Sequence, residues 1–135
     1  ILKKAEMEKF AQKLIDECDV RPAGCAMTQA GNLSGGNQQK LIIGREVSNN
    51  PDLLVAVQPT RGLDVGAIEQ VHKTLIRERD KGKAILLVSF ELDEVMNVSD
   101  TIAVIYDGAI QDTFAQGTVD ENTIGLLMAG GKKHE

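Results

Sequence analysis

A serine followed by two glycines at the start of a predicted helix is the feature of this sequence with the clearest chemical potential. Ser34, Gly35 and Gly36 lie in the run LSGGNQQK, from Leu33 to Lys40. The first amides of a helix have no intrahelical acceptor, and they present N–H groups and a positive dipole end to an approaching anion. The run therefore indicates an anion site. For an isolated Leu-Ser-Gly-Gly, a plain helix cap and turn would be the better interpretation.

The elements that must position this run are predicted from the spacing of apolar residues. Apolar residues recur at three- and four-residue steps in five segments that are expected to be helices: 3–17, 35–47, 67–80, 91–97 and 121–128. Short continuous apolar runs predict strands covered on both faces, and a second apolar pattern predicts a hairpin. The strands are expected at 53–57 and 84–88, with the intervening helix forming a βαβ unit, and the hairpin at 101–106 and 109–114.

Composition and charge exclude some classes of function. The net charge of the 135 residues is −5, whereas nucleic-acid-binding domains usually carry a dense Lys/Arg face. The aliphatic run 84–88 is far shorter than the roughly 20 residues of a membrane helix, so a membrane role has to come through a partner. Cys18 and Cys25 have no companion ligands at metal-site spacing. His72 and His134 are expected to be surface histidines, so no metal site is predicted.

Three blocks, in order along the chain, resemble the ABC ATPases. Residues 33–40 are similar to the signature motif of importers of ribose and other simple sugars. Residues 51–64, PDLLVAVQPTRGLD, look like the Walker B strand and the D-loop, and residues 87–92, LVSFEL, occupy the place of the switch histidine. Residues 58–67 most resemble the second ATP-binding domain of a tandem subunit in the simple-sugar and nucleoside importer branch. The chain begins at Ile1 without an initiator methionine, so we expect a C-terminal fragment of such a protein.

The resemblance implies an α/β fold of the P-loop NTPase type. Residues 1–50 are expected to be part of a helical subdomain with the signature helix, and residues 51–135 the C-terminal part of the RecA-like ATPase core. In this family the Walker A strand lies between the strands expected here at 84–89 and 101–106. The sequence contains no Walker A loop. We therefore expect these two strands either to close onto each other or to pair with another copy.

The resemblance also implies roles for four residues around ATP. In the family two such domains stack head to tail, and each signature faces the ATP bound to the opposite domain. Ser34, Gly35 and Gly36 are thus expected to contact the γ-phosphate in trans. Asp64 is expected to bridge the two domains near the nucleotide, and its place before a helix also predicts an N-terminal cap.

The sequence departs from the family at three positions of the domain's own ATP site. Val57 and Gln58 stand in place of the Walker B aspartate and glutamate, and Phe90 stands in place of the switch histidine. A valine offers no ligand to magnesium, and a glutamine cannot take a proton from water. No catalytic residue is therefore expected to be intact in cis. The fragment alone is predicted to be inactive, with ATP and Mg²⁺ bound in the full-length assembly.

The resemblance therefore implies the ATPase subunit of an importer for simple sugars or nucleosides. Its expected partners are a second ABC ATP-binding domain, a membrane permease and, indirectly, an external solute-binding protein, but no nucleic acid. Its expected location is the cytoplasmic face of the membrane, reached through the permease. Two alternatives stay open: a catalytically inactive interaction or regulatory module, and a soluble ABC-type ATPase without a permease.

Overall fold

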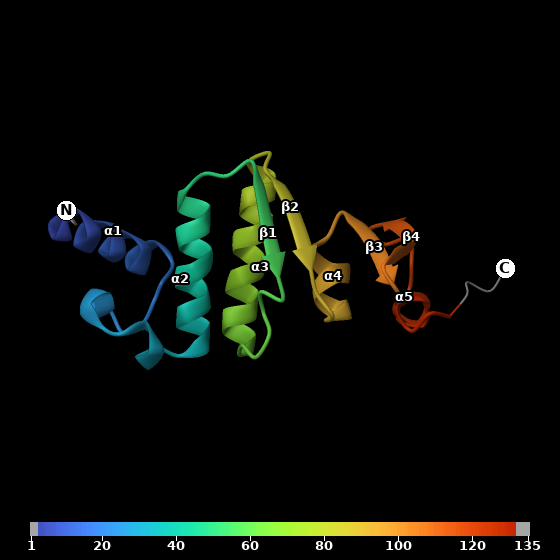
Figure 1. The fold of residues 1–135 in the computed structure, drawn as a ribbon, viewed down its shortest axis with the longest axis horizontal. Coiled ribbons are helices and arrows are strands. Elements are labelled where there is room, and N and C mark those ends of the chain that lie inside the picture. The colour runs from blue at the N-terminus through green and yellow to red at the C-terminus, as the bar shows by residue number, and fades with distance from the viewer. Residues whose placement is uncertain (1–2, 132–135) are drawn as a thin grey trace. The chain divides into compact units, whose positions relative to one another are not determined.

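A computed structural model describes residues 3–131 of the chain. These residues divide into two compact units, the first ending at Leu86 and the second beginning at Leu87. Figure 1 shows the elements in chain order. The predicted division after residue 50 falls inside the first unit. It remains a prediction, because it concerns the roles of two parts within a larger ATPase.

The first unit is built from helices and one small sheet, and its predicted helices and strands are confirmed. Its elements are α1 (Lys4–Glu17), the 3₁₀ turns η1 (Cys25–Met27) and η2 (Ala30–Asn32), α2 (Gly35–Ser48), β1 (Leu53–Val57), α3 (Val65–Asp80) and β2 (Ala84–Val88), which runs past the boundary.

Local chemistry sets the limits of these helices. α1 buries Leu14 and Ile15 on its apolar side. Ser34 caps α2 and Asp64 caps α3, each through a side-chain oxygen that accepts a backbone N–H. Gly82 ends α3 with a φ of 88°, in the left-handed region that glycine adopts without steric cost.

The sheet of the first unit has an open face. β1 and β2 pair in a two-stranded sheet, and their arrows run in the same direction in Figure 1, as the predicted βαβ unit requires. Leu54 is buried, whereas Leu53, Val55 and Val57 on the other side of β1 are exposed by 54, 52 and 62%. The expectation that β1 is covered on both faces is therefore not met by the described part of the chain.

The predicted closure of the 84–89 strand onto the 101–106 strand is wrong for the described residues. β2 pairs with β1, and β3 (Thr101–Tyr106) pairs with β4 (Ala109–Ala115). The short turn between β3 and β4 makes their pairing cheap in loop entropy, but within the described residues neither β2 nor β3 pairs with a second strand. The other alternative, pairing with another copy, stays a prediction.

The second unit contains α4 (Leu92–Val98), the β3–β4 hairpin and α5 (Glu121–Met128). Asp107 and Gly108 both have positive φ at the turn, the geometry of the tight hairpin loop that the sequence predicts. A bulge lies between Val104 and Ile105. The buried core of this unit consists of Ile102, Val104, Phe114, Ile124 and Leu127.

The cap of α5 makes stability in the second unit depend on pH. Asp120 accepts the Thr123 N–H at 2.8 Å and the Thr123 hydroxyl at 3.1 Å. These hydrogen bonds hold the pKa of the Asp120 carboxyl below its ordinary value of 3.8. A carboxyl whose pKa is lowered by folding contributes stability above its unfolded pKa, and that contribution is lost as the pH falls through the folded pKa.

We therefore expect Asp120→Asn, which keeps a capping oxygen, to be less stable than the parent at pH 7. The difference should shrink below pH 3.8 and vanish once Asp120 is protonated. Urea unfolding followed by circular dichroism at several pH values measures it. A difference that is constant with pH would contradict this account.

None of the helices between residues 3 and 131 combines the length and the apolar character that a membrane crossing requires. In the same range, no group of three or more His, Cys, Asp or Glu side chains is arranged to hold a metal ion.

Candidate functional site

The signature-like run lies at the amino end of α2. Leu33 is buried at 8% exposure and anchors the segment. The Ser34 hydroxyl accepts the Asn37 N–H at 3.4 Å and the Asn37 side-chain amide at 3.0 Å. Gly35 and Gly36 form the first turn of the helix. The predicted cap is confirmed, and the start of a 14-residue helix here presents its amides beside an exposed serine.

Asn37 fixes the start of α2 to the loop that follows α1. Its side-chain amide donates to the Arg21 carbonyl at 2.8 Å, and its side-chain oxygen accepts the Arg21 N–H at 3.1 Å. The sequence pattern did not predict a separate role for Asn37. Asparagine can donate and accept at once, but sequence spacing alone could not identify a partner 16 residues away.

Two other polar residues of the run are engaged within the chain. Gln38 donates to the Leu33 carbonyl at 2.9 Å, and Lys40 donates to the Asp19 carbonyl at 2.9 Å. Both side chains are therefore held by backbone carbonyls of the chain itself. Gly35 and Gly36 have different surroundings: a Cβ at Gly35 would meet nothing within 4 Å, whereas one at Gly36 would lie 3.0 Å from the Ala67 Cβ.

Asp64 is brought next to this run by the packing of α3 on α2. One of its carboxylate oxygens, Oδ1, accepts the Ala67 N–H at 2.9 Å and caps α3. The other, Oδ2, lies 3.7 Å from where a Cβ of Gly36 would be. The structure thus places a negative side chain between the amino ends of two helices, where the helix dipoles favour it.

The end of β1 carries the two residues that replace the Walker B acids in the resemblance. Val57 is exposed, and Gln58 follows it in the left-handed region with a φ of 49°. Neither side chain is ionisable, so neither can act as a general base. Phe90, exposed by 74%, belongs to the second unit.

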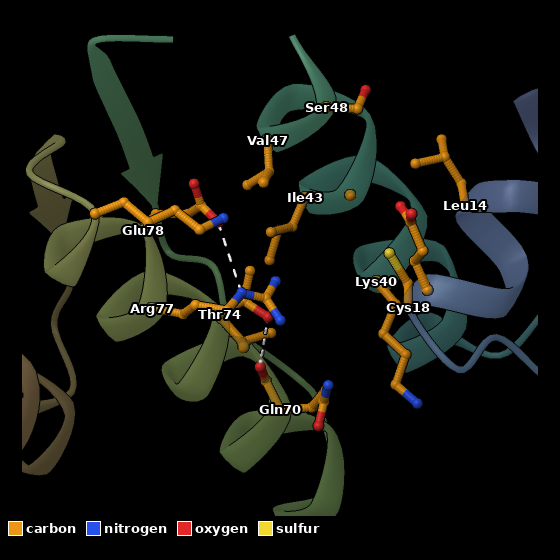
Figure 2. Close-up of a pocket in the computed structure, with 14 residues that line it drawn as sticks. Leu14, Cys18, Lys40, Ile43, Val47, Ser48, Gln70, Thr74, Arg77 and Glu78 are labelled. Atoms are coloured by element: carbon orange, nitrogen blue, oxygen red, sulfur yellow. Dashed lines mark hydrogen bonds and ion pairs between the residues drawn. The ribbon is translucent and has the colours of Figure 1, made fainter. Parts of the chain in front are cut away.

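A hollow of about 500 Å³ lies elsewhere in the first unit, between α1, α2 and α3. Figure 2 shows Ile43 and Val47 of α2 pointing toward α3. The hollow lies along the middle and carboxyl end of α2, away from Ser34 and Gly35. Its charged residues include Glu78, which pairs with Lys81 at 2.7 Å. The predicted nucleotide contacts and this hollow are therefore separate features.

Cys18 and Cys25 are free thiols, whereas His72 is less exposed than the surface position expected for it. Burial, followed by the charge of Glu17, raises the pKa of the Cys18 thiol, so this thiol is kept protonated at neutral pH. His72 is half-buried on α3, and His134 lies outside the described residues.

Known proteins similar to this chain are import ATP-binding proteins. The chain is 59% identical over 135 residues to the guanosine import ATP-binding protein NupO of Bacillus subtilis, matching 100% of this chain and 26% of that protein. It is 56% identical over 130 residues to the nucleoside import ATP-binding protein NupA of Lactococcus lactis subsp. cremoris, matching 96% of this chain and 26% of that protein. The chain thus spans about a quarter of the length of these relatives. No family model matches the sequence.

Solved structures similar to this one are ATP-binding cassettes. MJ1267, an ATP-binding cassette of an ABC transporter, superposes with a TM-score of 0.75 at 25% identity, over 96% of this chain and 51% of that protein. The cassette MJ0796, in a dimeric post-hydrolysis state bound to ADP and Pi, gives a TM-score of 0.72 at 24% identity, over 88% of this chain and 51% of that protein. The fold is therefore that of ABC ATPase domains of the P-loop NTPase type.

Proposed function

Because this chain is homologous over its whole length to part of the nucleoside and sugar import ATP-binding proteins, we propose that it is part of the ATP-binding subunit of an ABC importer. The transported solute is a nucleoside or a simple sugar, the classes named in its relatives. ATP hydrolysis by the full-length subunit would drive the import. A permease carries the subunit on the cytoplasmic face of the membrane, and an external protein delivers the solute.

The open amino end of α2 is the observation that supports a role in ATP hydrolysis. Ser34 is exposed there, and a Cβ added at Gly35 would meet nothing within 4 Å. A γ-phosphate held by the opposite domain could approach the first amides and the hydroxyl directly. In this role Ser34, Gly35 and Gly36 complete the partner's site and stabilise charge that develops on the transferred phosphoryl group.

The domain's own hydrolytic site is the degenerate one in this proposal. Magnesium needs oxygen ligands; Val57 offers none, and Gln58 offers only a neutral amide oxygen. Magnesium therefore does not fit the end of β1, and the Mg²⁺ that neutralises ATP belongs to the partner domain's site. Phe90 likewise cannot donate a hydrogen bond to a phosphate. The intact signature and the lost acids assign this domain to the supporting half of an asymmetric pair.

Co-purification tests the transport assignment. The full-length protein is expressed from its own operon context with an affinity tag, solubilised from membranes and analysed for partners. A membrane permease should be retained with it, and ATP hydrolysis should rise when that permease is reconstituted in vesicles. A full-length protein that hydrolyses ATP but never retains a permease would favour the soluble ATPase instead. One that associates without any response to ATP would favour the inactive module.

The chain by itself is expected not to bind ATP. The loop that wraps the β-phosphate and its lysine is missing from the sequence, and a single helix end is too little to hold a triphosphate against water. Isothermal titration calorimetry with Mg-ATP should show no binding at micromolar concentrations, whereas the full-length protein should bind. Micromolar affinity in the 135-residue chain would contradict the expectation.

A further inference from the structure

The two glycines of the signature-like run have different structural requirements. At Gly35 an added methyl group would enter open space. At Gly36 it would lie 3.0 Å from the Ala67 Cβ, much closer than the 3.5–4.0 Å at which carbon atoms attract best. Gly36 therefore lacks a side chain because α3 occupies that space, and this reason is independent of any nucleotide.

Neither Gly36 nor Ala67 can move freely away from the other. The start of α2 is tied to the preceding loop by the Asn37–Arg21 hydrogen bonds of 2.8 and 3.1 Å. On the other side Ala67 is 6% exposed and is already a single methyl group. A methyl group at position 36 would thus have to be accommodated by moving the first turn of α3, because a side chain as short as alanine has no rotamer with which to turn away.

The first turn of α3 determines where the Asp64 carboxylate lies. Asp64 is held by the Ala67 N–H at 2.9 Å, so the residue that faces Gly36 also supplies the amide that fixes the carboxylate. The contact between Gly36 and Ala67 consequently fixes two features together: the amides at the amino end of α2 and the negative charge beside them.

We infer that Gly36, in addition to its proposed place beside the γ-phosphate, is a positioning residue, which acts through Ala67 on Asp64. The inference rests on the proposed function, because it concerns the same signature in ATP hydrolysis. Gly35 leaves room for the nucleotide, and Gly36 sets the spacing between the signature helix and the Asp64 cap. The signature amides and Asp64 therefore reach the opposite domain as one rigid arrangement.

A mutant cycle in the full-length protein with its permease tests the inference. The variants are Gly36→Ala, Ala67→Gly and the two combined, with Gly31→Ala as the control, because a Cβ at Gly31 meets nothing within 4 Å and Gly31 lies outside the signature-like run. Gly36→Ala should lower the melting temperature and lower kcat about tenfold or more, since displacements near 1 Å can cost about 100-fold. The KM for ATP should change little, because the opposite domain holds most of the nucleotide.

Rescue is the decisive observation. Without the Ala67 methyl group, Gly36→Ala should have no further effect, so the double variant should have the melting temperature and kcat of Ala67→Gly alone. Independent sites do not show such coupling. Equal damage by Gly36→Ala in both backgrounds would overturn the inference, as would rescue of melting without rescue of kcat. Unchanged hydrolysis in Gly35→Asp would instead overturn the proposed function, and the melting cycle would still report on the contact.

Discussion

Replacing Gly35 by aspartate is expected to abolish nearly all transport-coupled ATP hydrolysis while the protein stays folded. The added carboxylate would stand at the open amino end of α2, where the γ-phosphate has to approach, and the two negative charges repel each other. Loss of one preorganised donor site for a developing anion costs about 100-fold or more in rate. The expected loss is at least this large, because a repelling charge replaces an attracting one.

The same substitution should leave stability unchanged or slightly improved, and this separates loss of function from misfolding. A Cβ at Gly35 meets nothing within 4 Å, its φ is not positive, and an acidic side chain in the first turn of a helix interacts favourably with the helix dipole. The measurement is the ATPase rate in reconstituted vesicles, together with the melting temperature of the same preparation.

Gln58→Ala is the matched substitution at the site that we propose to be degenerate. Under that proposal its effect on hydrolysis should be small, because Val57 and Phe90 would already leave the site without a magnesium ligand or a phosphate donor. Effects within one catalytic unit are strongly non-additive, so removing another member of a disabled set costs little. If Gln58→Ala were as damaging as Gly35→Asp, the domain's own site would be active and the asymmetric assignment would fail.

Gly44→Ala should destabilise the first unit, against the usual direction of such a change. Alanine in the middle of a helix is normally more stable than glycine by about 1 kcal/mol. Gly44 is buried in α2, and a methyl group there would overlap the Cys18 sulfur. To avoid the overlap, the thiol must turn away or α1 must move away from α2. Overpacking of this kind costs about 1–3 kcal/mol of stability, so the melting temperature should fall.

Removing the Cys18 sulfur should reverse the direction in which Gly44→Ala changes stability. In Cys18→Ala the remaining Cβ is 3.8 Å from a methyl group at position 44, an ordinary contact, so Gly44→Ala should become stabilising in that background. Gly31→Ala, where the methyl group meets nothing within 4 Å, controls for the substitution itself. Thermal unfolding of the chain by circular dichroism measures all four variants. Destabilisation that persists without the sulfur would locate the cost elsewhere in α2.

Secondary structure could be read from the sequence because it depends on local signals. The apolar spacing of α1 and α3, Ser34 before two glycines, and Asp107-Gly108 between apolar runs each determine a few neighbouring dihedral angles. The helices, strands and hairpin were therefore predicted to within a few residues of their observed bounds. Asp64 as a cap was predictable for the same reason.

Contacts between elements could not be read in this way. They depend on how helices pack, and the spacing of apolar residues gives no distance between helices. The contacts of this kind are Gly36 with Ala67, Cys18 with Gly44, and Asn37 with Arg21. The expected closure of the 84–89 strand failed for a related reason: the strand pattern does not specify the partner strand. The trans contact of the signature and the roles of Val57, Gln58 and Phe90 remain predictions, because they require the opposite domain and its nucleotide.

The left-handed backbone conformation of Gln58 affects which substitutions could place a general base at the end of β1. A non-glycine residue with a φ of 49° costs roughly 1 kcal/mol or more, and this cost falls on glutamine and glutamate alike. The left-handed conformation at position 58 therefore gives no reason by itself to prefer glutamine over glutamate. A reversion to glutamate at position 58 alone would gain nothing, because Val57 would still leave magnesium unbound. Under the proposed assignment, a return of hydrolysis at this site would therefore require changes at more than one position.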